Sequence, residues 1–215
     1  TIKPWVDVKE IKPLSISENP HAHRFIHTND KYVVLYSGNM GASHDIDSML
    51  EASMILRHHS DIKFLFIGEG EKFHDIRQFI SKHKLTNISL FPFQPEFLVK
   101  YTMPLADISL VSLDQGMEDL MVPSKTFYYL AAGSALVAIA NDQSELSDLL
   151  DQRLCGKLVP PGNPELLAST IQNIVSNPDQ LAKMKKNSRD LARSNYSREV
   201  STTKFSRLLI KYELL

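Results

Sequence analysis

The chain has 215 residues, of which 43% are hydrophobic, 23% are charged and 8% are aromatic. These values are typical of one folded globular unit and disfavour intrinsic disorder, collagen-like repetition and coiled coil. The 24 Lys and Arg residues nearly balance the 25 Asp and Glu residues, which leaves a formal net charge of -1. The overall electrostatic field of the protein therefore does not favour binding to nucleic acid or anionic lipid, and any phosphate group must be bound by local contacts.

Two features of the sequence bear on the cellular compartment. Cys155 is its single cysteine, so no internal disulfide forms and a reducing compartment is expected. The best apolar run, Ala135 to Ala140, is far shorter than the roughly 18 residues that cross a bilayer. No secretory leader is recognised either. We therefore expect a cytoplasmic protein.

The first 30 residues have no helical or strand periodicity. The chain starts at Thr1 rather than at a methionine, and it continues through a stretch that contains Pro and His residues. We expect the chain to be a fragment of a longer protein, with residues 1–30 as an interdomain linker.

From residue 31 the sequence alternates between short apolar runs and amphipathic stretches. The apolar runs predict buried strands at 32–36, 62–67, 88–93, 108–113, 135–140 and 156–159. The stretches between them predict helices at 43–58, 73–80, 97–101, 123–133 and 145–150. Almost wholly apolar strands separated by helices are typical of a parallel sheet that is covered on both faces. Right-handed crossovers then predict a Rossmann-like, doubly wound α/β fold over residues 31–195.

The chain beyond Pro160-Pro161-Gly162 is predicted to be helical. Asn163 is expected to cap a helix that begins at Pro164, and Pro178 is expected to begin the next one. Residues 196–215 predict a last amphipathic helix with no obvious strand to cover. It packs on the missing part of the protein, or it is a solvated or oligomer-forming tail.

Three loops that follow strands are suited to bind an anion. Ligands of open parallel sheets bind beyond the carboxyl ends of the strands, where helix N-termini offer free N–H groups. Gly38 to Gly41 and Gly68 to Gly70 let the backbone approach an anion closely, and Val122 to Lys125 adds a hydroxyl and an ammonium group. The sequence has no Walker motif and no G-x-G-x-x-G after a strand, which disfavours a P-loop ATPase or a hydride-transfer enzyme.

These loops belong to a series of short motifs in a fixed order. The series is Ser37-Gly38-Asn39-Met40-Gly41, Phe66-Ile67-Gly68-Glu69-Gly70, Ala106 to Val111, Pro123-Ser124-Lys125, Tyr129 to Gly133, Cys155-Gly156, Pro161-Gly162-Asn163 and Glu165 to Ala168. In this order, over nearly the whole chain, it resembles the C-terminal, donor-binding domain of the group 1 (family 4) retaining glycosyltransferases of GT-B architecture. The likeness is closest to bacterial enzymes that build O-antigen and capsule sugars.

The resemblance implies one half of a two-domain enzyme of the hexosyltransferase type, which is inactive without its N-terminal acceptor domain. Its donor would be a nucleotide sugar, expected to be a UDP-sugar, from which a hexose or amino sugar passes to a polysaccharide or lipid-linked acceptor. No bound metal is expected, because N–H donors and basic side chains would stabilise the leaving diphosphate. Peripheral membrane association of the full-length protein is left open.

The resemblance also implies roles for single residues. Gly38, Asn39 and Gly41 match the loop that faces the phosphates. The segment of the second phosphate contact comprises Val122, Pro123, Ser124 and Lys125. The Lys125 side chain is the expected countercharge, since a cation beside a phosphate in a partly dry cleft is strongly favourable.

The expected nucleoside end of the site lies on two other loops. Phe93 and Gln94 match the turn whose backbone reads the base, and Glu69 and Gly70 match the nearby rim. Many members of the family carry Arg and Lys in the first glycine loop, whereas this sequence has Asn39 and, approximately, His44. Phosphate neutralisation is therefore expected to fall to Lys125 or His44.

The acid pair of the family falls on Leu120 and Tyr128, neither of which is acidic. In the family the first acid contacts the sugar and the second holds the ribose hydroxyls. Glu118 and Asp119 lie close enough to replace the first acid, so Glu118 is a candidate catalytic residue together with Lys125. Tyr128 offers a single hydroxyl to a ribose.

Other readings of the sequence stay open. Asp45-Ile46-Asp47 has the D-x-D pattern of metal-dependent transferases, but acids at a helix start are favoured by the helix dipole alone, and no metal site is expected. Solvated side chains are expected for His21, His23 and His27. The alternative functions are a nucleotide-sugar epimerase or phosphorylase of the same fold and a non-catalytic binding domain that has lost its site.

Overall fold

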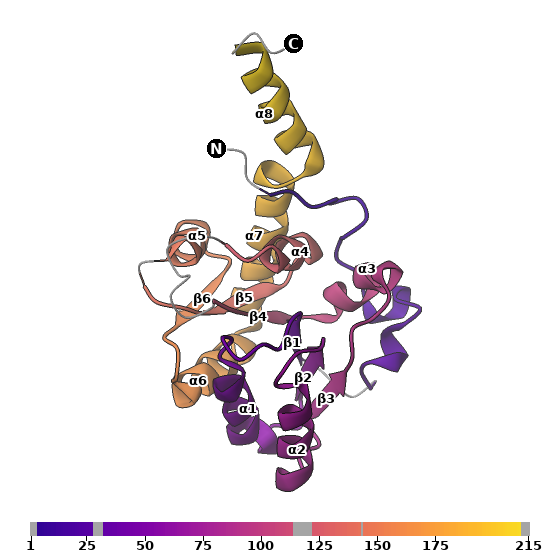
Figure 1. Cartoon of the computed structure of the whole chain (residues 1–215), viewed down its shortest axis with the longest axis vertical. Helices are drawn as coiled ribbons and strands as arrows, with labels where there is room; N and C mark the ends of the chain where they lie inside the picture. The colour runs from indigo at the N-terminus through magenta and orange to yellow at the C-terminus, as the bar shows by residue number, and fades with distance from the viewer. Residues whose placement is uncertain (1–3, 28–31, 114–121, 143, 212–215) are drawn as a thin grey trace.

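The computed structural model describes residues 4–27, 32–113, 122–142 and 144–211 (Figure 1). Within them, parallel strands form a sheet in the order β3-β2-β1-β4-β5-β6. The strands are β1 Tyr32–Ser37, β2 Ile62–Ile67, β3 Ile88–Phe91, β4 Ile108–Ser112, β5 Ala135–Ile139 and β6 Gly156–Val159. The strand order reverses direction between β1 and β4, so the predicted doubly wound α/β fold is confirmed.

The strands read as continuous apolar runs because both faces of the sheet are covered. Val33 and Leu35 of β1 belong to one hydrophobic core, and Val34 and Tyr36 belong to the other. Each of these four side chains is at most 2% exposed. Alternation along the strand therefore separates two buried layers rather than a buried face and a wet one.

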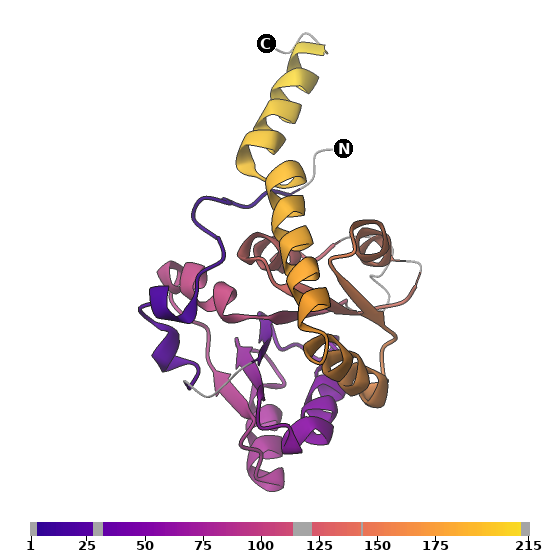
Figure 2. The same ribbon diagram turned by 180° about the vertical axis from the view of Figure 1, so that it is seen from behind.

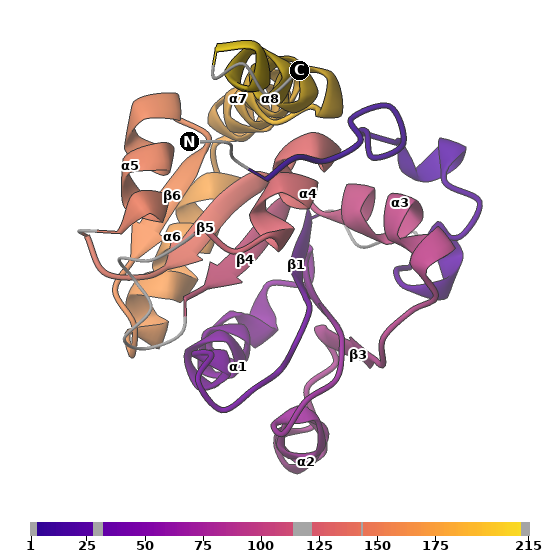
Figure 3. The same cartoon turned by 45° about the horizontal axis from the view of Figure 1, so that its top comes forward.

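Helices form a layer on each side of the sheet (Figures 1 and 3). They are α1 Ile46–Ile55, α2 Phe73–His83, α3 Val99–Thr102, α4 Lys125–Ala132, α5 Glu145–Arg153, α6 Pro164–Val175, α7 Pro178–Asn195 and α8 Arg198–Lys211. Single 3-10 turns are η1 Ile16–Glu18, η2 Ala22–Arg24, η3 Leu56–His58, η4 Glu96–Leu98 and η5 Met103–Leu105. One core packs against α1, α2 and α6, and the other against α4 and α5.

Three of the predicted helix boundaries are confirmed by their caps, whereas α2 and α5 each continue past the predicted ends at residues 80 and 150. Asp45 accepts a hydrogen bond from the Ser48 amide at 3.2 Å at the start of α1, and Asn163 accepts one from the Leu166 amide at 3.0 Å before α6. Gly133 ends α4 with φ of 74°. The sequence-based prediction is wrong at the end of β3, which stops at Phe91. The next residue is Pro92, which has no N–H group to continue the ladder.

The N-terminal segment, predicted without regular structure, packs on the domain through residues 4–27. Val6, Phe25 and Ile26 are buried in the hydrophobic core to which α4 also contributes. The Val6 amide donates to the Tyr196 carbonyl at 2.9 Å, and the Arg189 guanidinium donates to the Val8 carbonyl at 2.8 Å. The segment is thus part of the fold as described, while its role as an interdomain linker stays a prediction.

Helix α8 extends away from the rest of the domain (Figures 1 and 2). Ser201 is its one buried residue, whereas Phe205 is 50% and Ile210 is 65% exposed. Packing of this helix on a further part of the protein stays a prediction. Among the helices of the described ranges, none is both long enough and apolar enough to cross a membrane.

Candidate functional site

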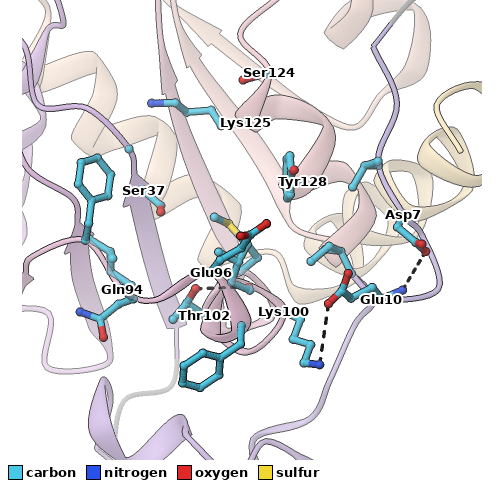
Figure 4. Close-up of a pocket in the computed structure, with 18 of the residues that line it drawn as sticks. Asp7, Glu10, Ser37, Gln94, Glu96, Lys100, Thr102, Ser124, Lys125 and Tyr128 are labelled. Atoms are coloured by element: carbon cyan, nitrogen blue, oxygen red, sulfur yellow. Dashed lines mark hydrogen bonds and ion pairs between the residues drawn. The ribbon is translucent and has the colours of Figure 1, made fainter. Parts of the chain in front are cut away.

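A pocket of about 930 Å³ opens where β1 and β2 end (Figure 4). Ser37 and Ile67, the last residues of those strands, line its floor. Around them are the glycine loop after β1, the start of α4, the segment after β3 and, on the far side, the N-terminal segment with the start of α8. A pocket at the carboxyl edge of a parallel sheet, beside the point where the strand order reverses, is the usual place for a ligand.

Six of the predicted site residues line this pocket, and they are Gly38, Phe93, Gln94, Ser124, Lys125 and Tyr128. Six others lie outside its lining, and they are Asn39, Gly41, Glu69, Gly70, Val122 and Pro123. The candidate Glu118, with Asp119 and Leu120, lies outside the described residues. The roles assigned to all of these residues stay predictions.

The Lys125 side chain lies directly over Gly38. A methyl group on Gly38 would overlap the Lys125 ammonium group, and Gly38 has φ of 146°. The same ammonium nitrogen lies 4.8 Å from the centre of the Tyr36 ring, within the range of a cation–π contact. Glycine is favoured at position 38 by this φ, which other residues rarely adopt, whereas the flexible Lys125 side chain could move away from a methyl group.

Two adjacent tyrosines of α4 have opposite environments, as their helical spacing predicts. Tyr129 is fully buried, and its hydroxyl accepts a hydrogen bond from the Ser37 amide at 2.8 Å and donates one to the Ser37 carbonyl at 3.1 Å. Burial raises the pKa of the Tyr129 hydroxyl well above its ordinary range. Tyr128 is 37% exposed and lines the pocket. Tyr129 therefore fixes α4 to the end of β1, while Tyr128 faces the pocket.

The second glycine loop supports the first one. A methyl group on Gly68, which has φ of 155°, would overlap the Gly38 carbonyl oxygen. The Met40 amide donates to the Glu69 carbonyl at 2.7 Å, and the Lys72 amide donates to the Met40 carbonyl at 2.9 Å. These contacts pack the two glycine loops against each other, while the anion contact expected for Gly68 to Gly70 stays a prediction.

Asn39 approaches the second glycine loop with its side chain and does not line the pocket. Its side chain is exposed, and its Oδ1 lies 2.7 Å from the position of a Cβ on Gly70. Its carbonyl accepts a hydrogen bond from the Tyr36 hydroxyl at 2.6 Å. The neighbouring His44 is half-buried, with its ring 6.3 Å from the Tyr36 ring. Of the two predicted phosphate cations, Lys125 is the one that lines the pocket.

Comparison with known proteins identifies the family. The family model described as Glycosyl transferases group 1 matches residues 20–191. The chain belongs to the group 1 glycosyltransferases. It is 27% identical over 208 residues to the probable glycosyltransferase WbjE of Pseudomonas aeruginosa, and the alignment covers 95% of this chain and 50% of WbjE. This chain thus spans about half the length of that relative.

Solved structures support the same fold. The structure of Anabaena HepE in complex with UDP and glucose superposes with a TM-score of 0.81 at 14% identity, over 97% of this chain and 55% of HepE. The C-terminal domain of the group 1 protein LpcC from Francisella tularensis superposes with a TM-score of 0.71 at 18% identity, over 90% of this chain and 99% of that domain. At these identities the likeness concerns the fold alone.

Both acids of the D-x-D pattern have polar partners within the fold. Besides capping α1, Asp45 accepts a hydrogen bond from the Gly162 amide at 2.8 Å. Asp47 forms an ion pair with Lys72 at 2.6 Å. As predicted, both acids lie at the start of α1, with Asp45 as the cap and Asp47 in the first turn. Over the described ranges, no three His, Cys, Asp or Glu residues are grouped in a way that could hold a metal ion.

The prediction that the three N-terminal histidines are solvated is confirmed in part. His23 and His27 are exposed, but His21 is half-buried and lies edge-on to the Tyr101 ring with 4.8 Å between ring centres. Cys155 is buried, and burial raises the pKa of its thiol to about 11.

The sequence-based prediction missed the far side of the pocket. Trp5, Glu10 and Arg198 line it from the N-terminal segment and the start of α8, and the Arg198 guanidinium lies 5.5 Å from the centre of the Trp5 ring. Glu96 and Phe97 line it from η4. Trp5 is 47% and Phe97 is 60% exposed, so neither contributes to the buried apolar periodicity that the sequence reveals, and no local sequence signal marks them as pocket residues.

Proposed function

We propose that this chain is the donor-binding half of a retaining glycosyltransferase, and that its pocket holds a nucleotide sugar, with a UDP-sugar as the first choice. One observation carries the proposal: the Lys125 ammonium group and the N-terminal end of α4 meet the Gly38 backbone at one wall of the pocket. A diphosphate fits such a wall, because a fixed cation and the positive end of a helix dipole both favour negative charge.

The same groups suit the chemistry of sugar transfer. As the bond between the sugar and the diphosphate breaks, negative charge grows on the leaving diphosphate. A preorganised ammonium group and backbone N–H groups stabilise that charge without reorganising. We propose that Lys125 has this role, and that the reaction needs no metal ion.

The comparisons support a nucleotide sugar as the donor. HepE was solved with UDP and glucose and has the fold of this chain. Because this chain spans about half of its relative WbjE, we place the acceptor site and any general base in the remaining part of the protein. The transferred group would be a hexose or an amino sugar and the acceptor a polysaccharide or lipid-linked saccharide. The chain alone would bind the donor without transferring it.

A non-catalytic binding domain is the second candidate. It is favoured by Tyr128, because this residue lines the pocket at the position where the resemblance implies an acid. Binding of the nucleotide is common to both candidates. An assay of the full-length protein with labelled nucleotide sugars and lipid-linked acceptors separates them.

Calorimetric titration of the chain with UDP and with GDP tests the proposed site. We expect saturable binding, and we expect Lys125→Ala to weaken it at least several-fold, since a charge-assisted contact contributes about 1.5 to 3 kcal/mol. Lys100→Ala is the matched control, because Lys100 also lines the pocket but lies 3.9 Å from Glu10 on its far side. Equal affinities of wild type and Lys125→Ala would remove Lys125 from the site. Absence of any saturable binding would overturn the proposal.

A further inference from the structure

The pocket of this chain contains a carboxylate to which no role has yet been assigned. Three acidic residues of the described part line the pocket, and they are Asp7, Glu10 and Glu96. Two of them are engaged. Asp7 accepts hydrogen bonds from the Lys9 amide at 2.9 Å and the Glu10 amide at 3.1 Å, which lower the pKa of its carboxyl group. Glu10 lies 3.9 Å from the Lys100 ammonium group.

Glu96 differs from these two acids. Its carboxylate forms no hydrogen bond or ion pair with any residue of the described ranges, although it lines the pocket and is exposed. Figure 4 draws Glu96 and Tyr128 reaching into the same pocket from opposite elements, η4 and α4. The Tyr128 hydroxyl likewise has no hydrogen-bond partner within the described residues.

Glu96 lines the same pocket as the two ends of the proposed nucleotide site. Lys125 and Gly38 form the end that suits a diphosphate. Phe93 and Gln94, in the loop after β3, form the end proposed for the base. In any nucleoside diphosphate the ribose connects the base to the phosphates, so it must lie between those ends. Glu96 is two residues beyond Gln94, and Tyr128 is one helical turn beyond Lys125.

We propose that Glu96 binds the vicinal hydroxyl groups of the nucleotide ribose. This inference rests on the proposed nucleotide site. An ionised carboxylate is an acceptor with two oxygens, so it can take both O–H groups of a vicinal diol, whereas a tyrosine hydroxyl has a single proton to give. Carboxylates recognise ribose hydroxyls in the same manner in other α/β nucleotide sites. Glu96 thus supplies, from η4, a carboxylate that α4 lacks at Tyr128.

A comparison of two nucleotides and three proteins tests this role. The nucleotides are UDP and 2′,3′-dideoxy-UDP, and the proteins are wild type, Glu96→Gln and Glu10→Gln. We expect wild type to bind UDP on the order of tenfold more tightly than the dideoxy compound, which is the loss expected for charge-assisted hydrogen bonds. In Glu96→Gln most of this preference should be lost, mainly through weaker binding of UDP, while Glu10→Gln should keep it. Glu96 is exposed, so its substitution leaves folding intact.

The outcomes separate the two proposals. If wild type binds UDP and Glu96→Gln prefers UDP over the dideoxy compound as strongly as wild type does, Glu96 does not bind the diol, and the nucleotide site stands. If wild type binds both nucleotides equally, the diol is not recognised and the role of Glu96 is overturned. If wild type binds neither UDP nor GDP, the nucleotide site itself fails, and the role of Glu96 fails with it.

Discussion

Replacement of Tyr129 by Phe removes a single oxygen atom and tests how the site is held together. The hydroxyl of Tyr129 bonds to both the amide and the carbonyl of Ser37, at 2.8 and 3.1 Å. Ser37 ends β1 and immediately precedes Gly38, while Tyr129 is one turn beyond Lys125 on α4. The two hydrogen bonds therefore join the two walls of the pocket that we propose for the diphosphate.

The expected cost follows from these contacts. The phenyl ring of Phe fills the volume of the Tyr129 ring, so no cavity forms and the loss is confined to hydrogen bonding. Partly buried backbone groups that lose their partner cost about 1 to 3 kcal/mol. We expect Tyr129→Phe to lower the free energy of unfolding by about 2 kcal/mol, measured by urea titration with an unchanged m-value.

The neighbouring residue provides the control. The Tyr128 hydroxyl has no hydrogen-bond partner among the described residues, and this side chain is 37% exposed, so Tyr128→Phe should change the free energy of unfolding by less than about 0.5 kcal/mol. In Tyr129→Phe the affinity for UDP should fall as well, because Gly38 and Lys125 are then held less firmly. Equal unfolding free energies for wild type and Tyr129→Phe would refute the proposed link between β1 and α4.

Three further predictions concern single positions. Gly68→Ala should destabilise the chain by about 1 to 3 kcal/mol in urea titration, since its φ is 155° and the methyl group would overlap the Gly38 carbonyl oxygen; an unaffected midpoint would contradict the packing of the two loops. Lys84 ends α2 in the left-handed region with φ of 49° and is exposed. Lys84→Gly should therefore raise the free energy of unfolding by about 0.5 to 1 kcal/mol. A lower melting temperature of this variant would contradict the left-handed conformation. Cys155 is buried, and its thiol pKa is about 11, so at pH 8 roughly one thiol in a thousand is ionised. An aromatic disulfide reagent should therefore react with the native chain far more slowly than with the unfolded chain. Rapid reaction of one thiol per native chain would contradict the burial of this residue.

The strands and the first site residues could be predicted because their signals are local. A short apolar run followed by glycine predicted Gly38 at the carboxyl end of a buried strand, and the predicted helix start placed Ser124 and Lys125 at the same edge of the sheet. The structure brings these three residues to a common pocket. Their predicted contact with a phosphate is left to experiment.

The N-terminal segment could not be predicted because its partners are distant in the sequence. Val6 pairs with Ser197 in a parallel bridge, and Arg189 donates to the carbonyls of Val8 and Ile11. Neither contact leaves a periodic pattern in the sequence of this segment, whose helical structure within residues 4–27 consists of isolated 3-10 turns. The far wall of the pocket depends on this packing, so its residues escaped prediction too.

Helix ends were hard to place where the usual residue is missing. Helix α5 continues to Arg153 and ends at Leu154, which has φ of 49°. A glycine at that position would have marked the end, as Gly133 does for α4. Leu154 adopts the left-handed conformation at a steric cost that tertiary packing must offset, and such packing is invisible in a local pattern.

Backbone amide spectra of the isotope-labelled chain, recorded during a titration with UDP, test most directly whether the proposed pocket is the nucleotide site. We predict that the largest chemical-shift changes occur at Gly38, Ser124 and Lys125, with a second group at Phe93 and Gln94. A second hollow in the described part of the molecule carries a cluster of basic residues, comprising Lys9, Lys12, Arg189 and Arg193. Shift changes confined to that cluster, or absent at saturating UDP, would contradict the assignment of the pocket between β1 and α4.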